Sequence, residues 1–180
     1  MTIRALIATV LATFGLVSAS VLPAQAMGTG NPYLDMQVGV TYTVYQPTFT
    51  AGLTQLKVGT APAGYGFAGD ANLLAQFGKG NGRNFSIWEG NPMGMDIGQG
   101  TLVGTAQVMG RTAKVYAYCD PASPKKCTMG DVSKFGGHLE VTLPAALGLR
   151  ETIVWIETIG KKPIAGQQLI TIAKGLTPVQ

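Results

Sequence analysis

The residues able to do chemistry in this chain are few, and their spacing narrows what they can do. The chain has two cysteines, Cys119 and Cys127, and one histidine, His138. Seven residues separate the cysteines, whereas a C-x-x-C redox motif has two between them. A zinc site needs further cysteine or histidine ligands, and His138 is the single histidine available. The pair therefore predicts a structural disulfide, formed in an oxidising compartment.

Catalysis has few side chains to use. The serines that follow the first 26 residues are Ser86, Ser123 and Ser133, and none lies in a G-x-S-x-G motif. A Ser-His-acid triad would have to join His138 to one of them from a distant segment. Carboxylate chemistry is the open alternative, and four acids are its candidates: Glu89, Asp96, Glu140 and Glu157.

Two motifs match a cofactor or metal pattern only in part. Residues 64–69, GYGFAG, fit G-x-G-x-x-G, but a dinucleotide site also needs a preceding parallel strand and a following helix, which this region does not predict. Met93, Met95 and His138 supply the ligand types of a Cu(I) site, and two methionines are too few to specify one. We expect no cofactor and no metal.

A ligand or partner face is the functional feature that the sequence favours. In RTAKVYAYC (111–119) the side chains of Lys114, Tyr116 and Tyr118 share one face of a predicted strand. Tyrosine offers a large apolar area and a hydroxyl, so two tyrosines beside a lysine can stack on a sugar or contact a partner. Together with Trp155, these residues form our candidate face. Cross-strand aromatic packing is the alternative role for them.

The first 26 residues predict export. Arg4 gives a positive start, residues 5–17 are apolar, and residues 24–26 form an A-x-A cleavage motif, the features of a secretory signal peptide. The apolar run is shorter than the about 20 residues that a membrane-spanning helix needs. No cysteine precedes Cys119, which argues against lipid attachment.

The expected organisation follows from these signals. We predict a signal peptide at 1–26, a flexible N-terminus at 27–35 and a single secreted domain at 36–180, secreted or held in the cell envelope, neither membrane-spanning nor lipid-anchored. The net charge of +4 falls to +3 when Arg4 is removed with the signal peptide. A nucleic-acid-binding domain would carry a concentrated basic patch, so we expect no nucleic-acid partner.

Short apolar runs separated by Gly, Pro and Asn predict a mostly β domain. The residues MQVGVTYTVY alternate apolar and polar side chains from Met36 to Val44, which predicts a strand. KGNG (79–82) and Met109-Gly110 look like hairpin connections. The other predicted strands lie at 53–58, 73–78, 84–89, 101–108, 111–119, 138–144 and 151–159, the last of them apolar on both faces as a central, doubly covered strand would be.

The period changes near the C-terminus. Leu169, Ile172, Ala173 and Leu176 fall at i, i+3, i+4 and i+7, one stripe of an amphipathic helix, although Ile170 leaves a strand as the alternative. The predicted fold class is α+β and mostly β, a curved antiparallel sheet with a C-terminal helix packed on it.

Four segments in order carry a resemblance to a known family: YTVYQPTFTAGLTQL, GRNFSIWEGN, VMGRTAKVYAY and TIVWIETIGKKPIAGQQLITIAKGL. They resemble a family of small bacterial extracytoplasmic domains of unknown function, which end in a Trp-bearing strand, a turn and a helix of the form xxLxxIAxxL. Gln167 and Gln168 stand where that family usually has acidic residues. The resemblance implies a strand-rich fold outside the cytoplasmic membrane and supplies no catalytic residues.

These observations lead to one functional hypothesis and one enzymatic rival, with a purely structural secreted protein as the third alternative. The hypothesis is an exported, non-catalytic binding or accessory domain with one disulfide, whose partner is an apolar small molecule, a peptide or an envelope component. The rival is a small secreted hydrolase that acts on cell-wall material through carboxylates such as Glu140 and Glu157.

Overall fold

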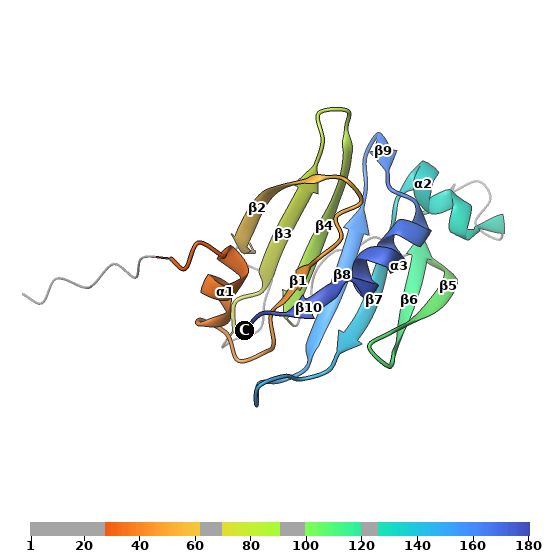
Figure 1. Ribbon diagram of the computed structural model, residues 1–180. Helices are drawn as coiled ribbons and strands as arrows, with labels where there is room; N and C mark the ends of the chain where they lie inside the picture. The colour runs from red at the N-terminus through yellow and green to blue at the C-terminus, as the bar shows by residue number, and fades with distance from the viewer. Residues whose placement is uncertain (1–27, 62–69, 91–99, 120–125) are drawn as a thin grey trace, which may run out of the picture.

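The structure, a computed structural model, describes residues 28–61, 70–90, 100–119 and 126–180 (Figure 1). Its main element is an eight-stranded sheet in the order β2-β3-β4-β8-β7-β6-β5, in which each strand is antiparallel to the next and β9 pairs in parallel with β4. The strands of this path are β2 (Thr54–Thr60), β3 (Leu73–Gly78), β4 (Arg83–Gly90), β5 (Thr101–Val108), β6 (Arg111–Ala117), β7 (Gly137–Leu143) and β8 (Thr152–Thr158), and β9 is Lys162–Pro163. A separate two-stranded ribbon joins β1 (Tyr45–Pro47) to β10 (Leu176–Pro178).

The predicted strands after residue 50 correspond to these elements within two residues at each end. Both predicted hairpins are confirmed. Residues 79–82 join β3 to β4, with the Lys79 amide donating to the carbonyl of Arg83 at 3.0 Å. Met109 and Gly110, both with positive φ, form the two-residue turn between β5 and β6, the backbone that matches the twist of a hairpin.

The predicted C-terminal helix is α3 (Gly166–Lys174), and it packs against β7, β6 and β8 on one face of the sheet (Figure 1). Leu169, Ile172 and Ala173 are fully buried there, as the stripe predicts. The side chain of Gln168 accepts from the backbone amide of Ala165 at 3.1 Å and so caps the helix start. Leu176 is also buried but belongs to β10.

The strand predicted from Met36 to Val44 is wrong. Helix α1 (Pro32–Gln37) occupies its first two positions, because Asn31 caps the helix by accepting from the Tyr33 amide at 3.0 Å and Pro32 suits the first helical turn. After the helix, the side chain of Gln37 accepts from the Val44 amide at 2.7 Å and donates to the Tyr42 carbonyl at 2.9 Å. A side chain thus satisfies backbone groups that the prediction assigned to a strand partner.

Two short helical elements complete the described chain: η2 (Met129–Asp131) and α2 (Val132–Phe135). They follow the second cysteine and bury Val132 against the core. Their last turn ends at Gly136, whose φ of 89° is easy only for glycine.

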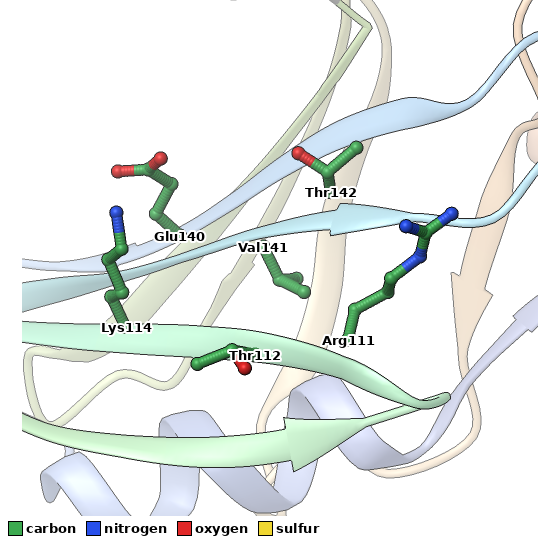
Figure 2. Close-up of a pocket in the computed structure, with 6 residues that line it drawn as sticks. All are labelled: Arg111, Thr112, Lys114, Glu140, Val141 and Thr142. Atoms are coloured by element: carbon green, nitrogen blue, oxygen red, sulfur yellow. The ribbon is translucent and has the colours of Figure 1, made fainter.

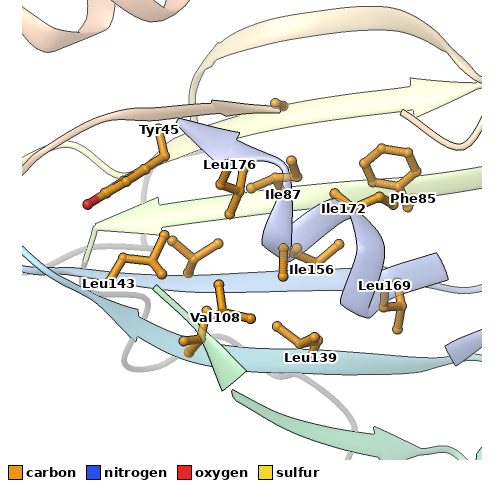
Figure 3. Packing of buried hydrophobic residues seen from close by; sticks show 14 of the residues in the cluster. Tyr45, Phe85, Ile87, Val108, Leu139, Leu143, Ile156, Leu169, Ile172 and Leu176 are labelled. Atoms are coloured by element: carbon orange, nitrogen blue, oxygen red, sulfur yellow. The ribbon is translucent and has the colours of Figure 1, made fainter. Parts of the chain in front are cut away.

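The sheet has a core face and an outer face, because successive side chains of a strand point to opposite sides. On the core face, α3 and the β1–β10 ribbon cover fully buried side chains of the central strands, among them Ile87, Leu139 and Ile156 (Figure 3). On the outer face, the side chains of the same strands are mostly partly exposed or exposed. The prediction for β8 is therefore half right: the strand is central, but Ile153, Trp155 and Glu157 are only partly buried.

Candidate functional site

The outer face brings the predicted face residues together from neighbouring strands. Lys114 and Tyr116 lie on β6, Tyr118 follows that strand, and Trp155 lies on β8. Strand β7 runs between β6 and β8, so its residues His138 and Glu140 complete the arrangement. Cross-strand register places Tyr116 opposite His138 and His138 opposite Glu157. One row further along the strands, Lys114 lies opposite Glu140, and Glu140 lies opposite Trp155.

A row of rings is the main apolar feature of this face. The rings of Tyr116 and His138 stack with centroids 4.7 Å apart and an interplanar angle of 17°. The His138 ring is also tilted against the rings of Trp155 and Tyr118, with centroid distances of 6.4 Å and 5.7 Å. We call Tyr116, His138 and Trp155 the aromatic row. These rings pack across strands, as the alternative considered from the sequence expects, and Tyr116 and Trp155 stay partly exposed.

Contacts of the Tyr118 hydroxyl with Glu157 and His138 fix the position of His138 in the aromatic row. The Tyr118 hydroxyl donates to Glu157 Oε1 at 2.6 Å and lies 3.3 Å from His138 Nδ1. Because the phenol proton points to the carboxylate, the contact with Nδ1 requires a proton on that nitrogen, which assigns the neutral Nδ1–H tautomer. Burial lowers the pKa of His138 to about 4. Burial, followed by the neighbouring Glu157, raises the pKa of Tyr118 above its ordinary value.

These states limit the acid–base chemistry of the cluster. A histidine with a pKa of about 4 is neutral at pH 7 and is a weak base. The Glu157 carboxylate already accepts a short hydrogen bond from Tyr118. The histidine and the carboxylate therefore act on each other through the phenol, which fixes the orientation of the imidazole ring.

A hollow of about 190 Å³ lies between β6 and β7 (Figure 2). Two of its residues neighbour the aromatic row, because Lys114 lies opposite Glu140 and Glu140 lies opposite Trp155. Figure 2 shows Lys114 and Glu140 projecting from adjacent strands to the same side, with Arg111 at the other end. Arg111 forms an ion pair with Glu151. The residues that line the hollow are Arg111, Thr112, Lys114, Glu140, Val141 and Thr142.

The three candidate acids of the hydrolase hypothesis that the structure describes do not all lie together. Glu140 and Glu157 share the outer face on neighbouring strands. Glu89 is on the core face of β4, with no exposed surface, so the sheet separates it from both. Asp96 lies outside the described residues, as do Met93, Met95 and the segment 64–69.

Glu89 is a buried carboxyl group that the sequence did not distinguish from the other acids. Its Oε2 accepts from the backbone amide of Tyr45 at 2.8 Å, which ties β1 to the main sheet. Its Oε1 has no hydrogen-bond partner within the described residues. Burial raises the pKa of Glu89 to about 8, and burial together with this carboxyl raises the pKa values of Tyr33, Tyr42 and Tyr45 around it. The only sequence signal was an acid in phase with Phe85 and Ile87, which are both buried.

The disulfide between Cys119 and Cys127 is confirmed, with the two Cα atoms 5.6 Å apart. It lies near the aromatic row, because Cys119 directly follows Tyr118, whose ring contacts His138. Both cysteines are partly buried against the core. The bond joins the end of β6 to the segment that leads into η2 and α2.

In the described part of the chain, no three His, Cys, Asp or Glu side chains are placed so that they could ligate one metal ion. None of the helices described is long and apolar enough to cross a bilayer. Comparison of the chain with family models, with curated proteins and with solved structures finds no match. The resemblance to extracytoplasmic domains of unknown function therefore stays a prediction.

Proposed function

We propose that this chain is an exported, non-catalytic binding domain that holds its ligand on the outer face of the sheet. The observation that carries the proposal is the aromatic row, in which partly exposed Tyr116 and Trp155 flank His138 beside a polar hollow. Partly exposed aromatic area next to polar side chains is the usual composition of a ligand-contacting surface.

Two features support export: the sequence of the N-terminus and the disulfide in the fold. The signal-peptide pattern of residues 1–26 directs the chain across a membrane. The disulfide is stable in the oxidising environment that follows export. The partner is accordingly a molecule of the envelope or the medium.

The arrangement of the polar groups favours binding over catalysis. His138 is neutral and hydrogen-bonded at Nδ1, and its ring is stacked, so it serves as part of the surface. One oxygen of the Glu157 carboxylate accepts the hydrogen bond of the Tyr118 hydroxyl. Lys114 and Glu140 are a donor and an acceptor placed side by side, an arrangement that suits recognition of a ligand with both kinds of group.

The proposal is tested with the mature, oxidised protein and an extract of the envelope of the organism that encodes it. We expect native mass spectrometry to show an adduct on the wild type that is lost in Tyr116→Ala. Phe49→Ala is the matched control, because Phe49 is a partly exposed aromatic residue that lies outside the outer-face cluster. An adduct that persists in Tyr116→Ala, or its absence from the wild type, would contradict the proposal.

A second assay separates binding from hydrolysis. Wall polymers, esters and phosphate esters are incubated with the wild type, Glu140→Gln, Glu157→Gln and His138→Ala. We expect no turnover by any of them. If the wild type shows turnover and one substitution lowers its rate by about 10²–10⁴-fold with the fold intact, the protein is a hydrolase and the binding proposal is wrong.

A further inference from the structure

We infer that the outer face binds a neutral pyranose saccharide, with one sugar residue in the hollow and the next against the aromatic row. This inference rests on the proposed function and names the ligand class of the same site. It follows from the hydrogen-bonding character, the charge balance, the size and the position of the hollow.

The hydrogen-bonding groups of the hollow match adjacent sugar hydroxyls. Lys114 only donates, and Glu140, its cross-strand partner, only accepts when ionised. A hydroxyl does both, so two neighbouring hydroxyls of one sugar can accept from Lys114 and donate to Glu140 at the same time. Thr112 on β6 and Thr142 on β7 add hydroxyl groups to the lining of the hollow.

The charge balance favours a neutral ligand. Arg111 and Lys114 are the cations of the hollow, and Glu140 together with Glu151, the ion-pair partner of Arg111, offsets them. A bound anion would face Glu140, and a bound cation would face Lys114. A polyol carries no net charge and interacts favourably with both side chains.

The size and position of the hollow fit one residue of a longer chain. Its volume of about 190 Å³ is below the range of about 300–1,000 Å³ that is common for drug-sized ligands. The hollow lies beside the aromatic row, since Glu140 lies opposite Trp155 and Lys114 is two residues before Tyr116. The C–H face of a pyranose packs on an aromatic ring, so a second sugar residue finds apolar contact where the first finds polar contact.

The same geometry argues against the other partner classes considered from the sequence. An extended peptide usually adds to the edge of a sheet, whereas this site lies on β6, β7 and β8, and the path of the sheet ends at β2 and β5. A purely apolar ligand would have to desolvate Lys114 and Glu140 without replacing their hydrogen bonds.

The test uses two neutral probes and isothermal titration calorimetry on the mature, oxidised protein. N-acetylglucosamine hexaose represents amino-sugar polymers of a wall, and a glucose hexaose represents neutral secreted polysaccharides. We expect at least one of them to bind, and we expect Lys114→Ala and Glu140→Gln each to weaken that binding by about tenfold or more. Lys114→Ala removes a charged donor, and Glu140→Gln replaces a charged acceptor with a neutral one. Lys57→Ala is the control, because this exposed lysine lies on β2, at the far edge of the sheet, and its substitution should leave binding unchanged.

Each of the other outcomes contradicts the role of the hollow, the saccharide inference or the proposed function. Saccharide binding that survives both Lys114→Ala and Glu140→Gln overturns the role of the hollow. Binding of neither hexaose, while an envelope adduct still depends on Tyr116, overturns the saccharide inference and keeps the proposed function. Absence of both hexaose binding and the envelope adduct overturns both.

Discussion

Buried Glu89 should make the protein less stable as the pH rises from acid to neutral. The carboxyl has no exposed surface and one unpartnered oxygen among the described residues, so the folded state favours its protonated form. Its pKa is 4.5 in an ordinary environment and about 8 in the fold, with burial as the main cause. Tyr33, Tyr42 and Tyr45 surround it, and none of them supplies a positive charge that would stabilise the carboxylate.

The sign and size follow from proton linkage. Below pH 4.5 both the folded and the unfolded protein are protonated at this site, and Glu89 costs no stability through ionisation. Between pH 4.5 and about 8 only the unfolded state loses the proton, so the free energy of unfolding falls by about 1.4 kcal/mol for each pH unit. From pH 4.5 to pH 7 this amounts to about 3 kcal/mol.

His138 acts in the opposite direction over part of this range. Burial lowers its pKa from 6.5 to about 4, so the unfolded state binds a proton that the folded state does not. Stability due to His138 is therefore lost as the pH falls from 6.5 towards 4. The two groups partly cancel in the wild type, and a comparison with a variant is needed to isolate Glu89.

Glu89→Gln is that variant, because glutamine keeps an acceptor for the Tyr45 amide and cannot ionise. Urea unfolding at several pH values should show that its stability relative to the wild type rises by about 3 kcal/mol from pH 4.5 to pH 7. Glu140→Gln makes the same substitution on the partly exposed outer face and serves as the control. Parallel curves of stability against pH for Glu89→Gln and the wild type would refute the assignment of a buried, protonated carboxyl.

Three further predictions concern the disulfide, the C-terminal helix and the aromatic row. The secreted protein should have the mass of residues 27–180 less two hydrogens, and Cys119→Ser with Cys127→Ser should cost about 2–3 kcal/mol for so short a loop; free thiols on the exported protein would contradict this. Leu169→Ala should cost about 2–5 kcal/mol in thermal or urea unfolding, whereas Gln167→Ala on the exposed side of α3 should be close to neutral, and equal effects would show that the helix is not docked. NMR titration of His138, the only histidine, should give a pKa near 4, and a value near 6.5 would mean that the ring is solvated.

The strands and the C-terminal helix could be predicted because their signals are local. Leu139, Val141 and Leu143 alternate with polar residues on β7 and are buried on its core face. The positions of Leu169 and Ile172 on one side of a helix follow from the helical period alone. Hairpin turns such as Met109-Gly110 are set by two residues and the strands beside them.

The segment from Met36 to Val44 shows where local reasoning failed. Its alternating pattern is genuine at Val40, Tyr42 and Val44, which are buried. Burial of alternate side chains does not require a full strand: here Tyr42 forms only an isolated bridge with Arg150, and Gln37 satisfies the Tyr42 carbonyl and the Val44 amide. The hydrogen bond between the Gln37 side chain and the amide of Val44, seven residues later, cannot be predicted from the spacing of apolar residues.

The sequence by itself determined which residues share a face of one strand, and it therefore grouped Lys114 with Tyr116 and Tyr118. It also determined the disulfide, since the chain has only two cysteines. The order of strands was decided by the tertiary structure, which placed β7 between β6 and β8 and so brought His138 between Tyr116 and Trp155. The tertiary structure also separated Glu89 from Glu157, placing one in the core and the other on the outer face. Pairing between strands far apart in the chain depends on the packing of the whole sheet, and no local pattern of residues encodes it.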